Sequence, residues 1–301
     1  MEDELWRTLY RIVIEEHSRR GHQKRVVFSD AVILLVAMWS VLHDRPMCWA
    51  CSLKHWRSHP DGCPWDSLPS PGTTSRRLRT LSLKQLLEQI FFRLLALSPP
   101  SMLRRIDSKP LPVGGFSKDR DAKRGYATGD TCRGYKIFGC WSGVAEGAGV
   151  VPEQLTLGPM NRSDPDAATT LIDGLTHGPL PGGYLLADST HDTNPLHKHA
   201  RTHHFQLLAP RKKPGSALGH RDHDPARLRG IELLEGPSDF GRDLYTRRGD
   251  IERSFAHLGN FGGGLQPLPN FVRRPRRVAF WAISKLVFNG IRICRLHGLT
   301  P

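Results

Sequence analysis

The spacing of apolar and polar positions divides the chain into a helical first third and a mixed remainder. Apolar residues recur at helical spacing in three N-terminal segments: residues 5–16, 30–42 and 81–97. After these, strands are predicted over residues 102–111, 135–144, 150–157, 183–188 and 205–209, and helices over residues 162–176 and 194–202, from about 250, and over 276–296. This order predicts an α/β fold, in which a small all-helical N-terminal domain (residues 1–100) precedes a mixed sheet flanked by helices (residues 101–301).

The stretch LYTRRGDIERSFAHL, residues 244–258, combines an apolar stripe with polar residues in step beside it. The stripe consists of Ile251, Phe255 and Leu258, at the spacing of a core-facing helix. Tyr245, Arg248 and Glu252 fall within about 60° of one another beside that stripe. Gly249 marks the predicted start of the helix, which puts Tyr245 just before it. Taken alone, such a polar face is more typical of a solvated helix surface than of a site.

The charge balance narrows the choice of partner. The chain carries 43 Lys and Arg against 29 Asp and Glu, a formal net charge of +14. This excess favours a polyanionic partner, and nucleic acid is the commonest, although an anionic membrane surface or solubility alone would also explain it. The N-terminal MEDELW lacks the basic and then apolar segments of a signal peptide, and the apolar run 31–39 is too short to cross a bilayer. Without a secretory signal, the six cysteines indicate reduced thiols. We therefore expect a cytoplasmic protein.

Two predicted strands carry a single acid at an informative place. Asp107 lies within or just past the first strand, and Asp188 ends the strand YLLAD. With Glu252 they could converge at one edge of the sheet, where three repelling carboxylates are stable chiefly around divalent metal. Oxygen ligands favour Mg²⁺ or Mn²⁺, and two such ions support phosphodiester cleavage. Each acid taken alone is more typical of a cap or a surface charge.

Three longer segments contain these acids: IDSKPLPVGGFSKDRDAKRG, LLADSTHDTNPL and RRGDIERSFAHLGNFGGGLQPLPNFVRRPRRVAFWAISKLVFNGIR. Between about residues 102 and 296 the chain resembles the DDE transposases of bacterial insertion sequences, in the insertion-sequence-five and insertion-sequence-four-like group. The resemblance implies an RNase H-like fold in which Asp107, Asp188 and Glu252 are the catalytic, metal-binding triad. It also implies that the protein cleaves DNA at the ends of its element and joins the 3′-OH to target DNA. Two Mg²⁺ or Mn²⁺ ions would assist both steps.

The same resemblance implies the partners. They are double-stranded DNA, both the terminal inverted repeats of the element and the target, and a second copy of the chain when assembled on DNA. No membrane and no small-molecule cofactor is expected, and the location is the bacterial cytoplasm, on the nucleoid. The N-terminal helices would bind DNA ends or pair protomers.

A related signature, Tyr-x2-Arg-x3-Glu-x6-Lys, is met by Tyr245, Arg248 and Glu252, whereas Gly259 replaces its lysine. After Asp188 the chain has Thr190 and His191 where such families often show Gly-Tyr, and histidine would stack on a displaced base less well. The full set of predicted DNA-binding residues is Tyr245, Arg248, Arg253, Arg76, Arg77, Arg79, Lys118, Arg120, Lys123, Arg124, Arg273, Arg274, Arg276 and Arg277. The three arginines at 76–79 are expected at a helix start that faces phosphates. Each basic cluster equally fits a solvated surface.

Other clusters leave alternatives open. Cys48, Cys51, His55, His59 and Cys63 could hold a structural zinc, although packed thiols and loop histidines fit better. Histidines at 197, 199, 203, 204, 220 and 223 surround a basic stretch, where a second metal site competes with a loop beside DNA. The alternative functions are a stand-alone RNase H-like metal-dependent nuclease and a catalytically lapsed DNA-binding regulator.

Overall fold

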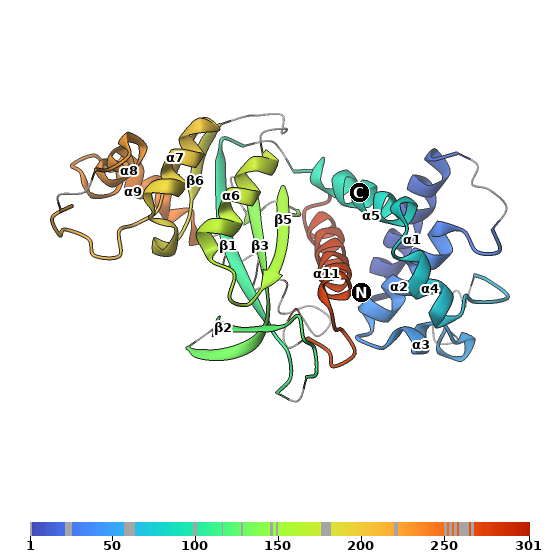
Figure 1. Cartoon of the computed structure of the whole chain (residues 1–301). Helices are drawn as coiled ribbons and strands as arrows, with labels where there is room; N and C mark the ends of the chain where they lie inside the picture. Colours follow the sequence, from blue (N-terminus) through green and yellow to red (C-terminus); the bar gives the residue numbers. More distant parts are fainter. Residues whose placement is uncertain are drawn as a thin grey trace. The chain divides into compact units, whose positions relative to one another are not determined.

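The chain forms two compact units, shown in Figure 1. The computed structural model describes residues 2–21, 26–56, 64–98, 101–115, 117–127, 129–144, 147–148, 150–175, 182–219, 222–249, 252, 255, 258, 265 and 268–301. The first unit, the helical unit, comprises residues 1–97, 260–265 and 271–301. The second, the sheet unit, comprises residues 98–259 and 266–270.

Four long helices pack pairwise in the helical unit. They are α1 (Glu2–Arg19), α2 (Asp30–Leu42), α5 (Leu81–Leu95) and α11 (Pro275–Leu296). The shorter α3 (Met47–Ala50), η1 (Leu53–His55) and α4 (Pro71–Arg77) lie between α2 and α5 in the chain. All three helices predicted in the first hundred residues are confirmed. The side chains of Ser29 and Thr80 cap α2 and α5, because each accepts a hydrogen bond from a backbone N–H three residues later.

Aromatic packing forms the centre of the helical unit. The rings of Trp6, Trp39 and Trp56 lie 4.8–5.6 Å apart between centroids. Helix α2 is buried along nearly its whole length, which agrees with the prediction of a core helix. Among the residues that the structure describes, no helix has both the length and the apolar character needed to cross a membrane.

The C-terminal helix belongs to the helical unit and not to the sheet unit, so the units differ here from the predicted domains. Helix α11 packs against α1, α2 and α5. Val278, Trp281 and Phe288 are buried, and the buried Lys285 pairs with Asp44, with 2.8 Å between Nζ and Oδ1. Periodicity shows that a helix has an apolar face, but not which part of the chain packs against that face. The apolar face of α11 packs against helices from the N-terminal end of the sequence.

The sheet unit contains a mixed sheet in the order β2-β3-β1-β6-β7, with β4 and β5 also paired to β3. Its strands are β1 (Leu103–Pro112), β2 (Lys123–Ala127), β3 (Asp130–Val144), β4 (Gly147–Ala148), β5 (Gln154–Pro159), β6 (Gly183–Leu186) and β7 (Phe205–Leu208). Strand β3 runs antiparallel to β1, β2, β4 and β5, whereas β1, β6 and β7 are parallel. The prediction of an α/β fold with a mixed sheet, preceded by a helical region, is confirmed; β2 and β4 were not predicted.

The helices of the sheet unit pack on this sheet or on one another. They are α6 (Asp164–Leu175), η2 (Ser189–His191), α7 (Asn194–Thr202), α8 (Pro225–Glu235) and α9 (Phe240–Thr246). Helix α6 packs across β5, β3 and β1 (Figure 1). Ile106, Leu171 and Leu185 belong to the buried cluster between the sheet, α6 and α7. Helices α8 and α9 were missed, because their segment is rich in turn residues and α8 buries only Ala226 and Gly230.

The predicted helix after Gly249 is described at a few positions. Gly249, Glu252, Phe255 and Leu258 are helical, and Ile251 lies outside the described residues. Phe255 and Leu258 are buried while Glu252 is exposed, as the apolar stripe predicts. The ring of Phe255 packs edge-on against Trp141 of β3, with centroids 4.8 Å apart. The stripe therefore packs the helix onto the sheet.

Candidate active site

Asp107 and Asp188 are brought together by strand register. Strands β1 and β6 are parallel, and Arg105 pairs with Leu186. Continuing that register by two residues aligns Asp107, in the middle of β1, with Asp188, two residues past the end of β6, with both side chains on one face. The two acids therefore lie side by side at the point where β6 ends and β1 continues.

Asp107 and Glu252 both contact Arg248, and Asp107 is the more buried of the two. Its side chain is 19% exposed, and Oδ1 accepts a 2.8 Å hydrogen bond from the backbone N–H of Ser108. Burial raises the pKa of Asp107, the Ser108 N–H and the Arg248 guanidinium oppose this, and the neighbouring Asp188 charge adds to the rise. A desolvated carboxylate beside a second acid is a position that a cation would stabilise.

Asp188 is held in place by donors from the turn that it caps. Its Oδ1 accepts hydrogen bonds from the backbone N–H and hydroxyl of Thr190 and lies 2.7 Å from Nδ1 of His191. Burial alone would raise the pKa of Asp188, but the hydrogen bonds from His191 and Thr190 hold it well below its usual range. Among the described residues, Oδ2 makes no hydrogen bond in the structure, so one oxygen is oriented and the other is open to a ligand.

Arg248 lies between Asp107 and Glu252. Its Nη2 is 3.8 Å from Oδ2 of Asp107, and its Nη1 is 3.3 Å from Oε1 of Glu252. The Glu252 side chain is 67% exposed, so this acid faces solvent more than the other two. The guanidinium thus partly compensates both carboxylates.

Tyr245 closes the site from α9. Its hydroxyl donates a 3.1 Å hydrogen bond to the carbonyl oxygen of Ala187, immediately before Asp188. Burial raises the pKa of Tyr245, Arg248 opposes the rise, and the charges of Asp188, Asp107 and Glu252 add to it. Tyr245 belongs to a separate short helix, as its predicted place before Gly249 suggested. All five residues predicted for the centre of the site are therefore neighbours.

The family comparison matches this part of the chain. The family described as "Transposase DDE domain" matches residues 99–284, a range that includes all three acids. The chain belongs to the DDE transposase family. Membership implies a metal-dependent enzyme that cleaves nucleic acid. In a comparison with curated protein sequences, none matches this transposase.

Among solved structures, the transposase is similar to the chain in "Cryo-EM structure of piggyBac transposase synaptic complex with hairpin DNA (SNHP)". The TM-score is 0.47 and the sequence identity is 11%, and the match covers 98% of this chain and 72% of that chain.

The donor set of the transposase fits a hard divalent cation. Asp107, Asp188 and Glu252 offer only carboxylate oxygens, the ligands that Mg²⁺ and Mn²⁺ prefer. The three carboxylates do not form one tight group, because Glu252 is turned to Arg248. Within the described part of the chain, the one group of three ligand atoms close enough for an ion is Asp173, His199 and His203.

Sequence reasoning missed Arg105 as a contributor to the site and did not foresee the role of His191. Arg105, on the same face of β1 as Asp107, donates from Nε to the carbonyl oxygen of Arg247 at 2.5 Å and so anchors the turn that carries Arg248. His191, considered from the sequence only as a poorer stacking residue than an aromatic, is 2% exposed and bonded to Asp188, so it supports the acid. An arginine within the apolar strand, two residues before its acid, was the available signal for Arg105.

A hairpin at the sheet edge displays one predicted basic cluster. Lys118, Arg120, Lys123 and Arg124 are all exposed. Beneath them, the buried Asp119 accepts a 2.8 Å hydrogen bond from the Tyr135 hydroxyl, and its backbone carbonyl accepts a bond from the guanidinium of Arg133. Arg133 also donates to the Ser117 carbonyl at 3.0 Å. The loop is therefore tied to β3 while its cations face outward.

The basic cluster at 76–79 differs from its prediction. Helix α4 begins at Pro71 with Ser70 as its cap, so Arg76 and Arg77 lie at its end and not at its start. Arg77 lies 2.5 Å from Asp30 and donates to the Phe28 carbonyl at 3.1 Å, so its guanidinium holds the helical unit together. The interpretation of these arginines as cations on a helix N-terminus was wrong, because the start signal of α4 is Ser70 with Pro71, six residues before Arg76. Arg76 and Arg79 are exposed.

The remaining predicted groups divide by exposure. Arg273, Arg274, Arg276 and Arg277 are exposed at the start of α11, whereas Arg253 lies outside the described residues. In the zinc candidate, the Cys51 thiol lies 3.6 Å from the Thr74 hydroxyl, and His55 stacks on Trp49 at 4.8 Å. His59 and Cys63 lie outside the described residues, and the described members of this cluster do not gather around one point.

Proposed function

We propose that this chain is the transposase of a bacterial insertion sequence of the insertion-sequence-five and insertion-sequence-four-like group. It binds the terminal inverted repeats of its element, cleaves at them and joins the 3′-OH to target DNA. The observation that carries the proposal is the register of β1 and β6, which aligns Asp107 with Asp188 beside Arg248 and Glu252. A stand-alone nuclease or a lapsed regulator is an outcome of the test below.

Asp107, Asp188 and Glu252 would hold two Mg²⁺ or Mn²⁺ ions. When bound, such ions activate water or a 3′-OH and stabilise the leaving oxygen. Asp107 supplies a desolvated carboxylate, and Asp188 supplies an open oxygen whose partner oxygen is fixed by Thr190 and His191. Glu252, the most exposed of the three, approaches from the helix after Gly249.

Arg248 and Tyr245 would position the scissile phosphate. The guanidinium of Arg248 now lies 3.3 and 3.8 Å from two carboxylates, distances longer than those of strong charge-assisted hydrogen bonds. A DNA phosphate that binds Arg248 bidentately competes with both contacts and leaves the Asp107 and Glu252 oxygens to the metal ions. DNA therefore promotes assembly of the site that cuts it.

Double-stranded DNA is the proposed partner, and two copies of the chain would pair on it to bring both element ends together. The net charge of +14 supports a polyanionic ligand. The exposed hairpin cations and the exposed arginines at the start of α11 are the proposed backbone contacts. The helical N-terminal region is proposed to bind the ends or to pair protomers.

The test supplies the flanking DNA of the gene as donor and assays cleavage and joining in Mg²⁺. Wild type is compared with Asp188→Asn and Glu252→Gln, and with Glu232→Gln as a matched control on an exposed glutamate of α8. We expect joined products from wild type and the control, with cleavage reduced at least about 1,000-fold in the two site variants. Equal cleavage by all four chains contradicts the assigned acids.

The other outcomes separate the alternative functions. Cleavage that never gives joined products would indicate a stand-alone nuclease. DNA binding without cleavage by any chain would indicate a lapsed regulator.

A further inference from the structure

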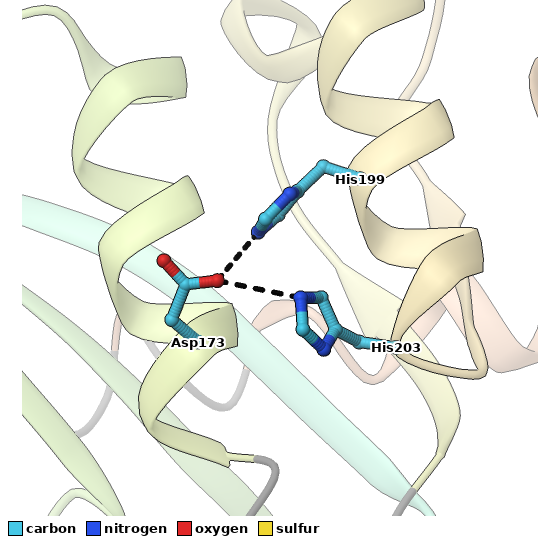
Figure 2. Close-up of side chains that lie close together, drawn as sticks. All are labelled: Asp173, His199 and His203. Atoms are coloured by element: carbon cyan, nitrogen blue, oxygen red, sulfur yellow. Dashed lines mark hydrogen bonds and ion pairs between the residues drawn. The ribbon is translucent and has the colours of Figure 1, made fainter.

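Three side chains outside the acidic site converge on one point between two helices of the sheet unit. Asp173 projects from α6, and His199 and His203 project toward it from α7 and its C-cap (Figure 2). The Nε2 atoms of His199 and His203 lie 2.8 and 3.3 Å from the same oxygen of Asp173. The two rings meet edge to face, 4.7 Å apart between centroids. This arrangement gathers two imidazoles and a carboxylate.

The backbone on both sides of the cluster is held in place. At the end of α6, the Gly174 carbonyl accepts a 3.0 Å hydrogen bond from Gln154, which ties it to β5. At the end of α7, His204 turns the chain with φ 63°, and its carbonyl accepts a hydrogen bond from Gly183 as β7 begins. Leu171, Ile172 and Ala200 pack beneath, in the core shared by α6 and α7. The three ligand atoms are therefore brought together before any ion arrives.

The distances fit a tetrahedral transition-metal site. All three ligand atoms lie within 4.8 Å of one another. Metal–ligand bonds near 2.0–2.1 Å imply ligand-to-ligand edges of about 3.3 Å. The His203–Asp173 separation of 3.3 Å already has this length, and the His199–Asp173 separation of 2.8 Å requires a movement of about 0.5 Å. Water would complete the fourth position, because all three residues reach solvent.

The ligand types distinguish this cluster from the acidic site. Two histidines four residues apart on one helix face are a common zinc-binding pair. Imidazole favours Zn²⁺ and its neighbours in the first transition row, whereas all-carboxylate sites favour Mg²⁺ and Mn²⁺. The softer imidazole ligands would therefore select a Zn²⁺-class ion, and the harder carboxylates of the acidic site would select Mg²⁺ or Mn²⁺.

We propose that Asp173, His199 and His203 form a second metal site, which binds one Zn²⁺-class ion and clamps α6 to α7. Helix α6 also packs against η2, the turn that carries His191 beside Asp188. The clamp stabilises the scaffold behind the acidic site and does not take part in the chemistry. It is independent of the proposed transposition, since it concerns binding and stability.

The test titrates untagged, chelator-treated protein with Zn²⁺ in excess Mg²⁺, which keeps the carboxylate site occupied by the harder ion. We expect one equivalent of bound Zn²⁺ and a rise of about 5 °C in the thermal midpoint at saturation. Asp173→Asn, nearly the same shape but a poorer ligand, and His203→Ala weaken binding at least about 100-fold. Asp107→Asn still binds one equivalent of Zn²⁺, which distinguishes this site from the acidic one.

His297→Ala is the matched control, because His297 is an exposed C-cap histidine of α11, as His203 is the C-cap of α7. It retains full Zn²⁺ binding. If the wild type bound no equivalent of Zn²⁺, the proposal would be overturned, and the three residues would form a hydrogen-bonded cluster only. Binding that survives both Asp173→Asn and His203→Ala would overturn it as well, because the ion would then lie elsewhere.

Discussion

At the scale of single residues, the support of Asp188 by His191 is the most sharply testable contact. His191→Ala removes the donor 2.7 Å from Oδ1 and leaves Thr190 alone to orient the carboxylate. We expect DNA cleavage to fall about 10–100-fold and to need more Mg²⁺, as when an outer partner of a metal ligand is lost. His191→Asn returns an N–H at nearly the same place and restores part of the activity. The measurement is the cleavage rate against Mg²⁺ concentration.

His191 can also be judged on stability. If the alanine variant lost stability but cleaved with the wild-type rate and Mg²⁺ dependence, His191 would only fill space in the fold.

At the scale of elements, α8 is tied to the turn after Asp188 by one ion pair. Arg227 meets both oxygens of Asp192 at 2.7 Å, and the Asp192 side chain is nearly buried. Burial would raise the pKa of Asp192, but the hydrogen bonds from Arg227 and the neighbouring His197, 3.4 Å away, lower it to about 2. Since the folded pKa lies below the unfolded one, this stabilisation is present above about pH 4 and is lost as the pH falls toward about 2.

Arg227→Met should therefore lower the free energy of unfolding by about 1–3 kcal/mol at neutral pH and by less at pH near 3. Urea unfolding at both pH values measures the difference. Arg201→Met is the control, because its pair with Asp224 is half exposed on the arginine side and should contribute less than about 1 kcal/mol. Equal losses in the two variants at both pH values would show that the buried pair has no special weight.

At the scale of the whole molecule, the helical unit is completed by the far end of the chain. Phe288 of α11 is fully buried against helices from the first hundred residues. We expect Phe288→Ala to cost about 3–5 kcal/mol and to remove hydrogen-exchange protection from α1, α2 and α5 before β1 and β3. Leu296→Ala on the same helix is 71% exposed and should stay within about 0.5 kcal/mol of wild type. Loss of protection in the strands first would contradict this assignment.

The sequence by itself determined the elements and the chemistry that each can carry. Helical and strand periods are local, so α2, α5, β1, β6 and most other elements could be predicted from neighbouring residues. The same holds for the acids, since a carboxylate beside an apolar strand is visible as Asp107 and as Asp188 in the chain alone. Their assignment as catalytic came from the resemblance and stays a prediction.

Only the tertiary structure decided which of these groups meet. The β1–β6 register sets Asp107 beside Asp188. Arg77 forms an ion pair with Asp30, although its neighbours Arg76 and Arg79 are exposed. The fold also sends α11 to the N-terminal helices and brings Asp173 to His199 and His203. These contacts join positions far apart in sequence, and their partners are chosen by shape, charge and burial in three dimensions, which no local period records.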